Sequence, residues 1–151
     1  MQITSPSFAP NGEIPRQFTC QGDDTSPELR IEGVPPGAKS LALIVEDPDA
    51  PDPAAPKRVW THWVLYDLPP GTTRLSEGGD GDGALKGQND WGKAAWGGPC
   101  PPIGRHRYFF RLYALDTELG DLGEPTKAEL REAMEGHVVG QAELVGTYQK
   151  S

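Results

Sequence analysis

Proline and glycine interrupt this chain so often that long helices have little room to form. Its 151 residues include 16 prolines and 19 glycines, and these follow no repeating period. Both residue types occur mainly at turns and are costly inside helices. The distribution therefore predicts many turns between short strands. The length suits one domain, residues 1–151, which is large enough to bury a hydrophobic core.

Four segments are predicted to be β-strands. Residues 41–45 form a continuous apolar run, which is typical of a strand buried on both faces. Residues 60–68 alternate more loosely and end at two prolines and a glycine. Residues 106–115 alternate clearly, and residues 142–148 form the last strand.

Two of these strands carry histidines at positions that are expected to point inward. On residues 60–68, the alternation is expected to place His62 on one face with Val64, Tyr66 and Leu68. On residues 106–115, it places His106 and Tyr108 on one face with Phe110 and Leu112.

One helix is predicted late in the chain. Thr126 and Glu129 have the spacing of a capping box, with Thr126 as the N-cap residue. Leu130 and Met134 begin a helical apolar spacing that continues to residue 141, and Gly140 can end the helix in a left-handed conformation. Strands followed by one short helix indicate an all-β sandwich with a small helical appendage.

The acidic charge limits the partners that this chain can have. Its formal net charge is −8 at pH 7, which repels nucleic-acid phosphates and anionic membrane surfaces. No apolar run is long enough to span a bilayer, and the first residues do not resemble a signal peptide. We therefore expect a cytoplasmic protein that does not bind nucleic acid or insert stably into membranes.

Two further features have an ordinary and a specific interpretation. Cys20 and Cys100 lie far apart in the sequence and do not have metal-type spacing. A cytosolic setting favours free thiols, although a disulfide between them is also possible if their loops meet. The Gly-rich stretch 69–105 contains Asp-Gly-Asp-Gly at residues 80–83, which resembles part of a calcium loop. The other oxygen ligands are absent, so a solvated turn is the favoured interpretation.

Three segments carry the polar groups that suggest a binding site. They are the acidic, proline-containing turn 46–51, the aromatic and histidine-containing segment 60–63, and the Gly/Pro-rich segment 97–108. Each one alone is usually a structural feature. Together they place two histidines, two aspartates and a tyrosine on elements that can converge.

The order and spacing of these motifs resemble the phosphatidylethanolamine-binding (Raf-kinase-inhibitor-like) family, in its compact bacterial and archaeal branch. The motifs are Asp-Pro-Asp-Ala-Pro at 47–51, His62 after an aromatic residue, and Gly-x-His-Arg-Tyr at 104–108. Further similarity lies at 18–22, 89–92 and 144–148, so the resemblance covers essentially the whole chain. It implies an antiparallel Greek-key β-sandwich with a ligand pocket at one rim.

The resemblance also implies which residues bind the ligand. His137 is included because the short helix stands where animal members of the family have an element that shields the pocket. The expected ligand-binding residues are Asp47, Asp49, Ala50, Pro51, Trp60, His62, Gly97, Gly98, Pro101, Pro102, His106, Tyr108 and His137.

Physical chemistry supports an anion as the ligand. Phosphate needs converging donors, which backbone N–H groups at Gly97 and Gly98, imidazole rings and a phenol can supply. We expect one of the two aspartates to accept from a histidine, fixing its tautomer and raising its pKa. Affinity for phosphate should then rise as the pH falls toward about 6.

The sequence therefore predicts a non-catalytic protein that binds a small anionic or phosphorylated ligand, without metal or cofactor. The main alternative is an inhibitor of a protease or kinase that acts through a protein–protein surface, and a homodimer is a further expectation. A metal triad of His62, His106 and Asp47 is a weaker alternative. A serine hydrolase is weaker still, because no Gly-x-Ser-x-Gly motif is present.

Overall fold

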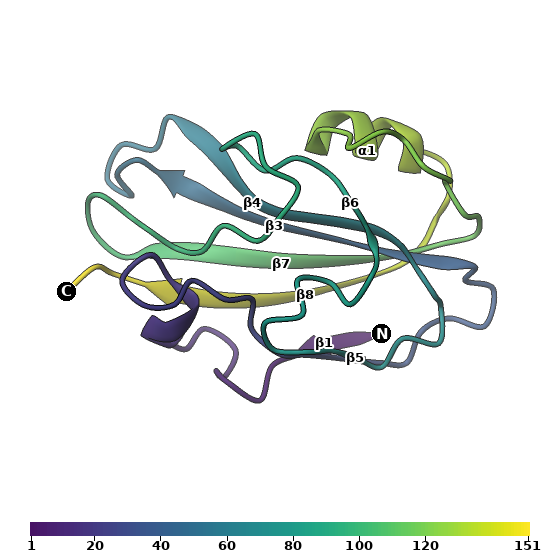
Figure 1. Cartoon of the computed structure of the whole chain (residues 1–151), viewed down its shortest axis with the longest axis horizontal. Coiled ribbons are helices and arrows are strands. Elements are labelled where there is room, and N and C mark those ends of the chain that lie inside the picture. Colours follow the sequence, from purple (N-terminus) through teal and green to yellow (C-terminus); the bar gives the residue numbers. More distant parts are fainter.

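The computed structural model describes residues 1–151 and consists mainly of two antiparallel β-sheets (Figure 1). The smaller sheet has the order β1-β2-β5, formed by Gln2–Thr4, Leu29–Glu32 and Arg74–Leu75. The larger sheet has the order β6-β4-β3-β7-β8, formed by Leu85–Lys86, Arg58–Leu68, Ser40–Ala50, His106–Leu115 and Val138–Tyr148. A 3₁₀ turn, η1 (Arg16–Phe18), and one helix, α1 (Lys127–Met134), complete the elements.

The predicted sandwich is confirmed, and all four predicted strands are present. After the β3–β4 hairpin, the chain returns through a long connection to pair β7 with the other edge of β3, which is the expected Greek-key connection. Strand β7 has the predicted bounds, whereas β3, β4 and β8 are longer than predicted. No helix has the length and apolarity needed to cross a membrane.

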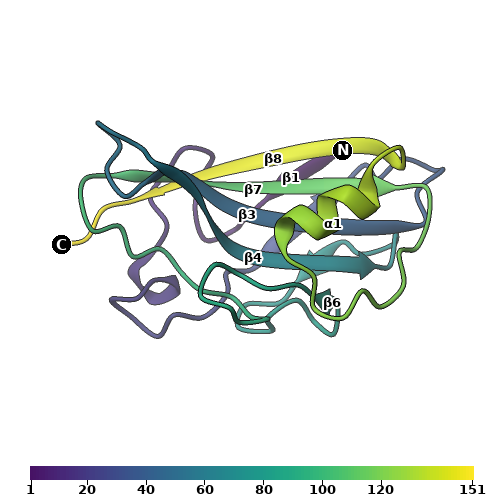
Figure 2. The same cartoon turned by 90° about the horizontal axis from the view of Figure 1, so that it is seen from above.

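The main hydrophobic core lies between the two sheets and contains 20 buried residues from both. Strand β7 contributes Tyr108, Phe110 and Leu112 to it, as its alternation predicts. A second cluster lies on the opposite face of the larger sheet, where α1 packs against β3 and β4 (Figure 2). Strand β3 is therefore buried on both faces, in agreement with its apolar sequence.

Irregularities in the β3–β4 pairing correct the predicted faces of β4. The register shifts between Leu41 and Leu43 and again between Val45 and Glu46. A bulge inserts an extra residue and so reverses which side chains point to a given face. Val64 and Tyr66 consequently pack under α1, while His62 faces the other way, toward a pocket.

Helix α1 is shorter than predicted. It begins with the expected capping box of Thr126 and Glu129, and it buries Leu130 and Met134. It ends at Met134, because Gly136 has a φ of +80° and turns the chain into β8. The apolar spacing that suggested a longer helix belongs to the start of this strand.

The first residues of the chain cover part of the free edge of β8. The N–H of Asn11 donates to the Val145 carbonyl at 2.7 Å, and the N–H of Ile14 donates to Thr147 at 2.8 Å. The N–H of Thr147 donates in return to the Gly12 carbonyl at 2.9 Å. These bonds occupy backbone groups that an edge strand otherwise leaves open.

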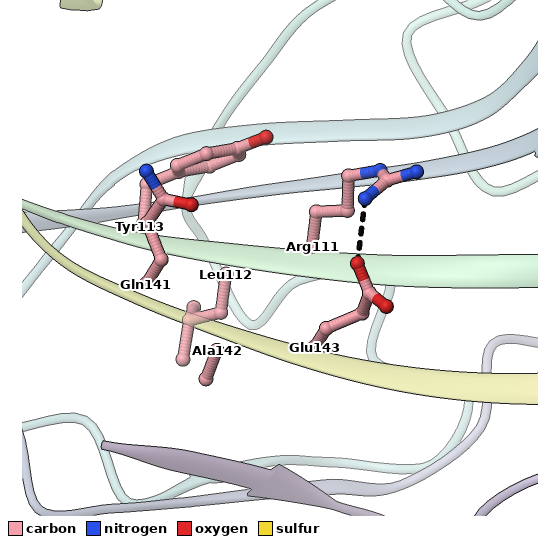
Figure 3. Close-up of a pocket in the computed structure, with 6 residues that line it drawn as sticks. All are labelled: Arg111, Leu112, Tyr113, Gln141, Ala142 and Glu143. Atoms are coloured by element: carbon pink, nitrogen blue, oxygen red, sulfur yellow. Dashed lines mark hydrogen bonds and ion pairs between the residues drawn. The ribbon is translucent and has the colours of Figure 1, made fainter.

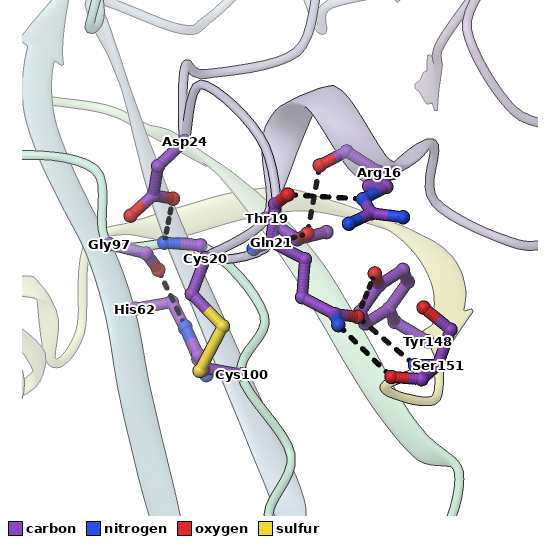
Figure 4. The surroundings of a disulfide bond; sticks show 11 residues. Arg16, Thr19, Cys20, Gln21, Asp24, His62, Gly97, Cys100, Tyr148 and Ser151 are labelled. Carbon is purple, nitrogen blue, oxygen red and sulfur yellow. Dashed lines mark hydrogen bonds between the residues drawn. A yellow bond between two sulfur atoms is a disulfide. The ribbon is translucent and has the colours of Figure 1, made fainter.

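Cys20 and Cys100 form a disulfide, which corrects the preference for free thiols. Their Cα atoms are 5.4 Å apart, although 80 residues separate them in the sequence. The bond joins the loop after η1 to the segment before β7 (Figure 4). Sequence spacing does not show such proximity, because the fold alone brings these two loops together.

Candidate ligand pocket

A cavity of about 480 Å³ lies at one end of the sandwich. In both cartoon views, the β3–β4 connection and the segment before β7 lie at the same end as the C-terminus (Figures 1 and 2). Nine of the expected residues line the cavity together with four that were not expected. The lining residues are Asp47, Ala50, Pro51, Lys57, Arg58, Trp60, His62, Trp91, Cys100, Pro101, Pro102, His106 and Tyr108.

His106 and Asp47 form a buried pair in this pocket. Asp47 Oδ2 lies 2.5 Å from His106 Nδ1, and His106 Nε2 lies 2.9 Å and 3.1 Å from the carbonyls of Ile103 and Pro51. Carbonyl oxygens only accept, so Nε2 carries a hydrogen. Burial raises the pKa of Asp47, although the hydrogen bond from His106 opposes this. One further proton lies between Nδ1 and Oδ2. If it is on His106, the pair is an imidazolium and a carboxylate; if it is on Asp47, both groups are neutral. In either case the pair has no net charge.

His62 is held in one neutral tautomer. Its Nδ1 lies 2.6 Å from the Gly97 carbonyl, so Nδ1 carries the hydrogen and Nε2 is left with a lone pair. Nε2 makes no hydrogen bond within the protein. Burial lowers the pKa of His62 to about 4, so the ring stays uncharged at neutral pH.

Two buried polar atoms of the lining residues have no partner in the protein. They are the hydroxyl of Tyr108 and the indole N–H of Trp60. Burial, together with the nearby Asp47 and Asp49 carboxylates, raises the pKa of Tyr108, so its hydroxyl stays protonated. A buried hydroxyl without a partner is unfavourable, and a bound ligand relieves that cost if it accepts the hydrogen bond.

The cationic part of the lining lies at the start of β4. Arg58 stacks over the Trp60 ring at 4.4 Å and pairs with Asp90 at 3.4 Å. Lys57 is exposed and makes no ion pair. Lys57 is therefore the cation at this pocket whose charge is not already matched by a carboxylate.

A group of aromatic side chains lies beside these cations. Trp91 packs edge-on against both Trp60 and His62, with ring centroids 5.3 Å and 5.2 Å apart. Tyr108 also packs edge-on against His62, with ring centroids 5.2 Å apart. The His62 ring therefore contacts two aromatic side chains, of which Trp91 is still 46% exposed at the surface.

The structure places Asp49 behind the pocket. Asp49 accepts hydrogen bonds from the backbone and the guanidinium of Arg107, at 2.9–3.0 Å. Burial alone would raise the pKa of Asp49, but the bonds from Arg107 outweigh it and lower the pKa. Asp47 is thus the aspartate that pairs with a histidine, whereas Asp49 accepts from the backbone N–H and the guanidinium of Arg107 on β7.

Gly97 and Gly98 do not supply free N–H donors. The N–H of Gly97 donates to the His62 carbonyl at 3.0 Å, and the N–H of Gly98 donates to Asp24 Oδ1 at 2.8 Å. Both donors are thus used within the protein, which corrects the expected backbone cradle for phosphate. Gly97 acts through its carbonyl, which sets the tautomer of His62.

His137 does not belong to this pocket. It lies in the turn between α1 and β8, is partly exposed, and pairs with Asp116 at 2.8 Å. The early end of α1 and the start of β8 account for this position. The element that would shield the pocket is therefore not the helix, which packs on the opposite face of the larger sheet.

The two metal alternatives find no support in the geometry. Both ring nitrogens of His106 face protein acceptors, and no cluster of three or more metal-type side chains is present. In the 80–83 turn, Asp80 accepts from Trp63, from the Trp96 backbone and from Lys86. Its carboxylate therefore anchors the core and the Gly-rich stretch.

A second, smaller hollow of about 300 Å³ lies on the outer face of β7 and β8 (Figure 3). Arg111 and Glu143 form an ion pair at 2.5 Å across these strands. Gln141 and Tyr113 lie beside it. None of the expected site residues lines this hollow, whereas nine of them line the rim cavity.

Sequence reasoning missed Lys57, Arg58, Trp91 and Cys100 as lining residues. The first two follow a turn that has no regular pattern, and Trp91 lies in the long Gly-rich stretch. Their positions depend on how loops fold over the sheet, which periodicity does not encode. The signal available in the sequence was the pair of cations Lys57 and Arg58 shortly before the motif histidine His62.

The comparisons with known proteins agree with this fold. Residues 4–149 match the family model described as phosphatidylethanolamine-binding protein. A UPF0098 protein of Methanothermobacter thermautotrophicus is 49% identical over 99% of both chains, and one of Chlamydia pneumoniae is 49% identical over the full length of both.

Solved structures show the same fold. A phosphatidylethanolamine-binding protein homologue from Chlamydia trachomatis superposes with a TM-score of 0.93 at 45% identity, covering 99% of this chain and 97% of that one. E. coli YbcL, described as a member of the mammalian family, gives a TM-score of 0.87 at 32% identity, covering 99% and 98%. The chain therefore belongs to the phosphatidylethanolamine-binding protein family.

Proposed function

We propose that this protein binds a small phosphate-bearing ligand in the rim cavity and does not transform it. The Tyr108 hydroxyl carries the proposal, because it is buried in a lining residue and has no partner in the protein. Lys57 supplies a positive charge at the mouth, and the Asp47–His106 pair leaves the floor without net charge. The name of the family, which refers to a phosphorylated lipid headgroup, supports the same class of ligand.

The tautomer of His62 adds a requirement on the ligand. Because Nε2 has a lone pair and no partner in the protein, it can accept a hydrogen bond from a donor on the ligand. A phosphate monoester that keeps one proton provides a donor for His62 and acceptors for Tyr108 and Lys57. The second pKa of such a group is about 6, so the monoprotonated form gains population as the pH falls from 7.

The expected pH dependence thus keeps its direction but changes its cause. His62, with a pKa of about 4, gains little charge between pH 7 and 6. We expect affinity for phosphate to rise over that range because the ligand gains a proton. Sulfate is a suitable comparison, because it stays unprotonated over the same range and should bind more weakly and without this pH dependence.

The test is an NMR titration of phosphoethanolamine and inorganic phosphate that follows the ring signals of His62 and Tyr108. Tyr108→Phe should weaken binding by about tenfold or more, the usual effect of losing a hydrogen bond to a charged group. The free variant should unfold at the same temperature or higher, because the lost hydroxyl has no partner.

Tyr113→Phe is the matched control. Its hydroxyl lies on the outer face of the larger sheet, where it accepts from Arg131 at 3.4 Å, so binding should be unchanged. Equal phosphate affinity in Tyr108→Phe and the wild type would refute the pocket proposal. Equal affinity for sulfate and phosphate at pH 6 would refute the proposed role of His62.

Exposed Trp91 favours the second candidate function, inhibition of a protease or kinase, because exposed aromatic side chains often anchor protein interfaces. The two functions predict different effects of the same variants. Tyr108→Phe should spare an inhibitory surface, whereas Trp91→Ala should weaken it. The two candidates are separated by measuring how strongly both variants inhibit a panel of proteases and kinases. If the wild type inhibits none of them, the inhibitor function is ruled out for that panel.

A further inference from the structure

The disulfide forms part of the pocket. Cys100 lines the cavity directly before the lining residues Pro101 and Pro102, and both cysteines are exposed at the surface. Figure 4 shows the bond beside Gly97, whose carbonyl accepts from His62. A reductant can therefore reach a bond that lies in the wall of the candidate site.

Residues 99–103, which we call the pocket wall, make few hydrogen bonds, although Pro99 and Pro101 are buried. Three of these five residues are prolines, which lack an N–H donor. The Pro99 carbonyl accepts from the Cys20 N–H at 3.1 Å, and the Ile103 carbonyl accepts from His106. The backbone of residues 100–102 between them makes no hydrogen bond.

Cys20, in contrast, lies in a loop that is firmly held. The N–H of Gly22 donates to Thr19 at 3.0 Å, and the Gln21 side chain accepts from the Tyr148 hydroxyl and the Ser151 N–H (Figure 4). Gly98 approaches this loop so closely that a Cβ there would lie 2.2 Å from the Phe18 carbonyl oxygen. Breaking the disulfide thus removes the covalent attachment of the pocket wall and leaves the anchoring loop in place.

We propose that the Cys20–Cys100 disulfide is a redox switch that controls ligand binding. A dithiol reductant attacks one sulfur through its thiolate, forms a mixed disulfide, and closes its own disulfide with its second thiol. Two electrons and two protons pass to the protein, which then carries two thiols. Because few hydrogen bonds hold the wall, it becomes more mobile, and the pocket binds its ligand less tightly.

The inference rests on the proposed phosphate-binding function for its effect on affinity. If the reduced wall holds the binding conformation about one tenth of the time, the apparent affinity falls about tenfold. Oxidation restores the bond and the affinity. The oxidised protein is thus the binding form, and the reduced protein is the weakly binding form.

The experiment compares oxidised protein, protein reduced with dithiothreitol, and the variant Cys20→Ser/Cys100→Ser. Phosphoethanolamine affinity is measured by NMR titration, and backbone ¹⁵N order parameters are measured at Cys100 and Ile103. Reduction should weaken binding about tenfold and lower both order parameters from rigid values near 0.85 toward 0.6. Gln21 and Gly98, in the anchored parts, should keep theirs.

The double variant is the control for other effects of the reductant. It should bind like the reduced wild type and should not respond to dithiothreitol, and its far-UV circular dichroism should show that it is folded. Equal affinity of the oxidised and reduced wild type would overturn the switch. If oxidised protein does not bind phosphoethanolamine at all, the proposed function fails, and the order parameters alone decide: unchanged values then overturn the switch.

Discussion

His62 and His106 line the same pocket, but their ring nitrogens have different partners. Both nitrogens of His106 face acceptors within the protein, so this side chain uses its hydrogen-bonding groups on Asp47 and on the Ile103 carbonyl. His62 uses only Nδ1 and leaves Nε2 open. Of the two, His62 is therefore the residue whose chemistry is available to a ligand.

Burial of neutral His62 should make stability depend on pH. Its pKa is about 4 in the folded protein and about 6.5 when unfolded, so the unfolded chain binds more protons between these values. Its contribution is fully present above pH 6.5 and is lost as the pH falls toward 4, by about 3 kcal/mol in total. Urea unfolding between pH 7 and 4.5 measures this loss.

His62→Asn is the comparison for that measurement, because an asparagine amide can still donate to the Gly97 carbonyl but does not titrate. The free energy of unfolding of the variant should fall less steeply below pH 6.5. The raised pKa of Asp47 acts with the opposite sign, but it does so in both proteins. Parallel curves for wild type and variant would contradict the assignment of a depressed pKa to His62.

At the scale of elements, α1 is attached to the larger sheet through one buried carboxylate as well as through apolar contacts. Glu46 on β3 pairs with Lys127 at 2.8 Å and Arg131 at 2.9 Å on α1, and with Arg111 at 2.9 Å on β7. Burial alone would raise the pKa of Glu46, but Arg131 and Lys127 outweigh it and lower the pKa to about 2. The carboxylate therefore stays charged throughout the neutral range.

Glu46→Gln should lower the free energy of unfolding by about 2–3 kcal/mol at pH 7, since removing one partner leaves partly buried cations unmatched. Glu143→Gln is the matched control: Glu143 pairs with the same Arg111 but is exposed, so its loss should cost less than about 1 kcal/mol. Thermal or urea unfolding of both variants tests this. Equal losses of unfolding free energy in the two variants would show that the burial of Glu46 does not increase the contribution of its ion pairs to stability.

The elements also show where sequence reasoning stops. The apolar run in β3, the alternation in β7 and the capping box of α1 are local signals, and each predicted its element. The faces of β4 were predicted wrongly because bulges depend on the pairing of two strands. The end of α1 was placed too late because the side chains at the start of β8 happen to continue the helical spacing.

For the whole molecule, the family motifs predicted the sandwich and nine of the thirteen lining residues. The four that were missed, and the Cys20–Cys100 bond, lie on loops that meet only in the folded chain. The prediction that the N–H groups of Gly97 and Gly98 bind phosphate was wrong for the same reason. A glycine indicates that another group can come close to the backbone, but only the fold determines which group does so. At Gly98 that neighbour is another loop of the same chain.

The covered edge of β8 leads to a prediction about the whole chain. Asn11 has a φ of +63° and donates its N–H to Val145, so Asn11→Pro removes the donor and requires a different backbone. The variant should form aggregates that bind thioflavin T at temperatures below its unfolding midpoint. Asn11→Gly keeps the N–H and tolerates the positive φ, so it should stay monodisperse; aggregation of both to the same extent would contradict the idea.

The same cover has a consequence during synthesis. Residues 11–14 leave the ribosome well before the strand whose edge they protect, because β8 follows them much later in the sequence. When β8 is synthesised, the protecting segment is therefore already available, within the same molecule and at high effective concentration. Neighbouring nascent chains on one messenger must compete with that internal partner, which reduces the chance that two copies pair through β8.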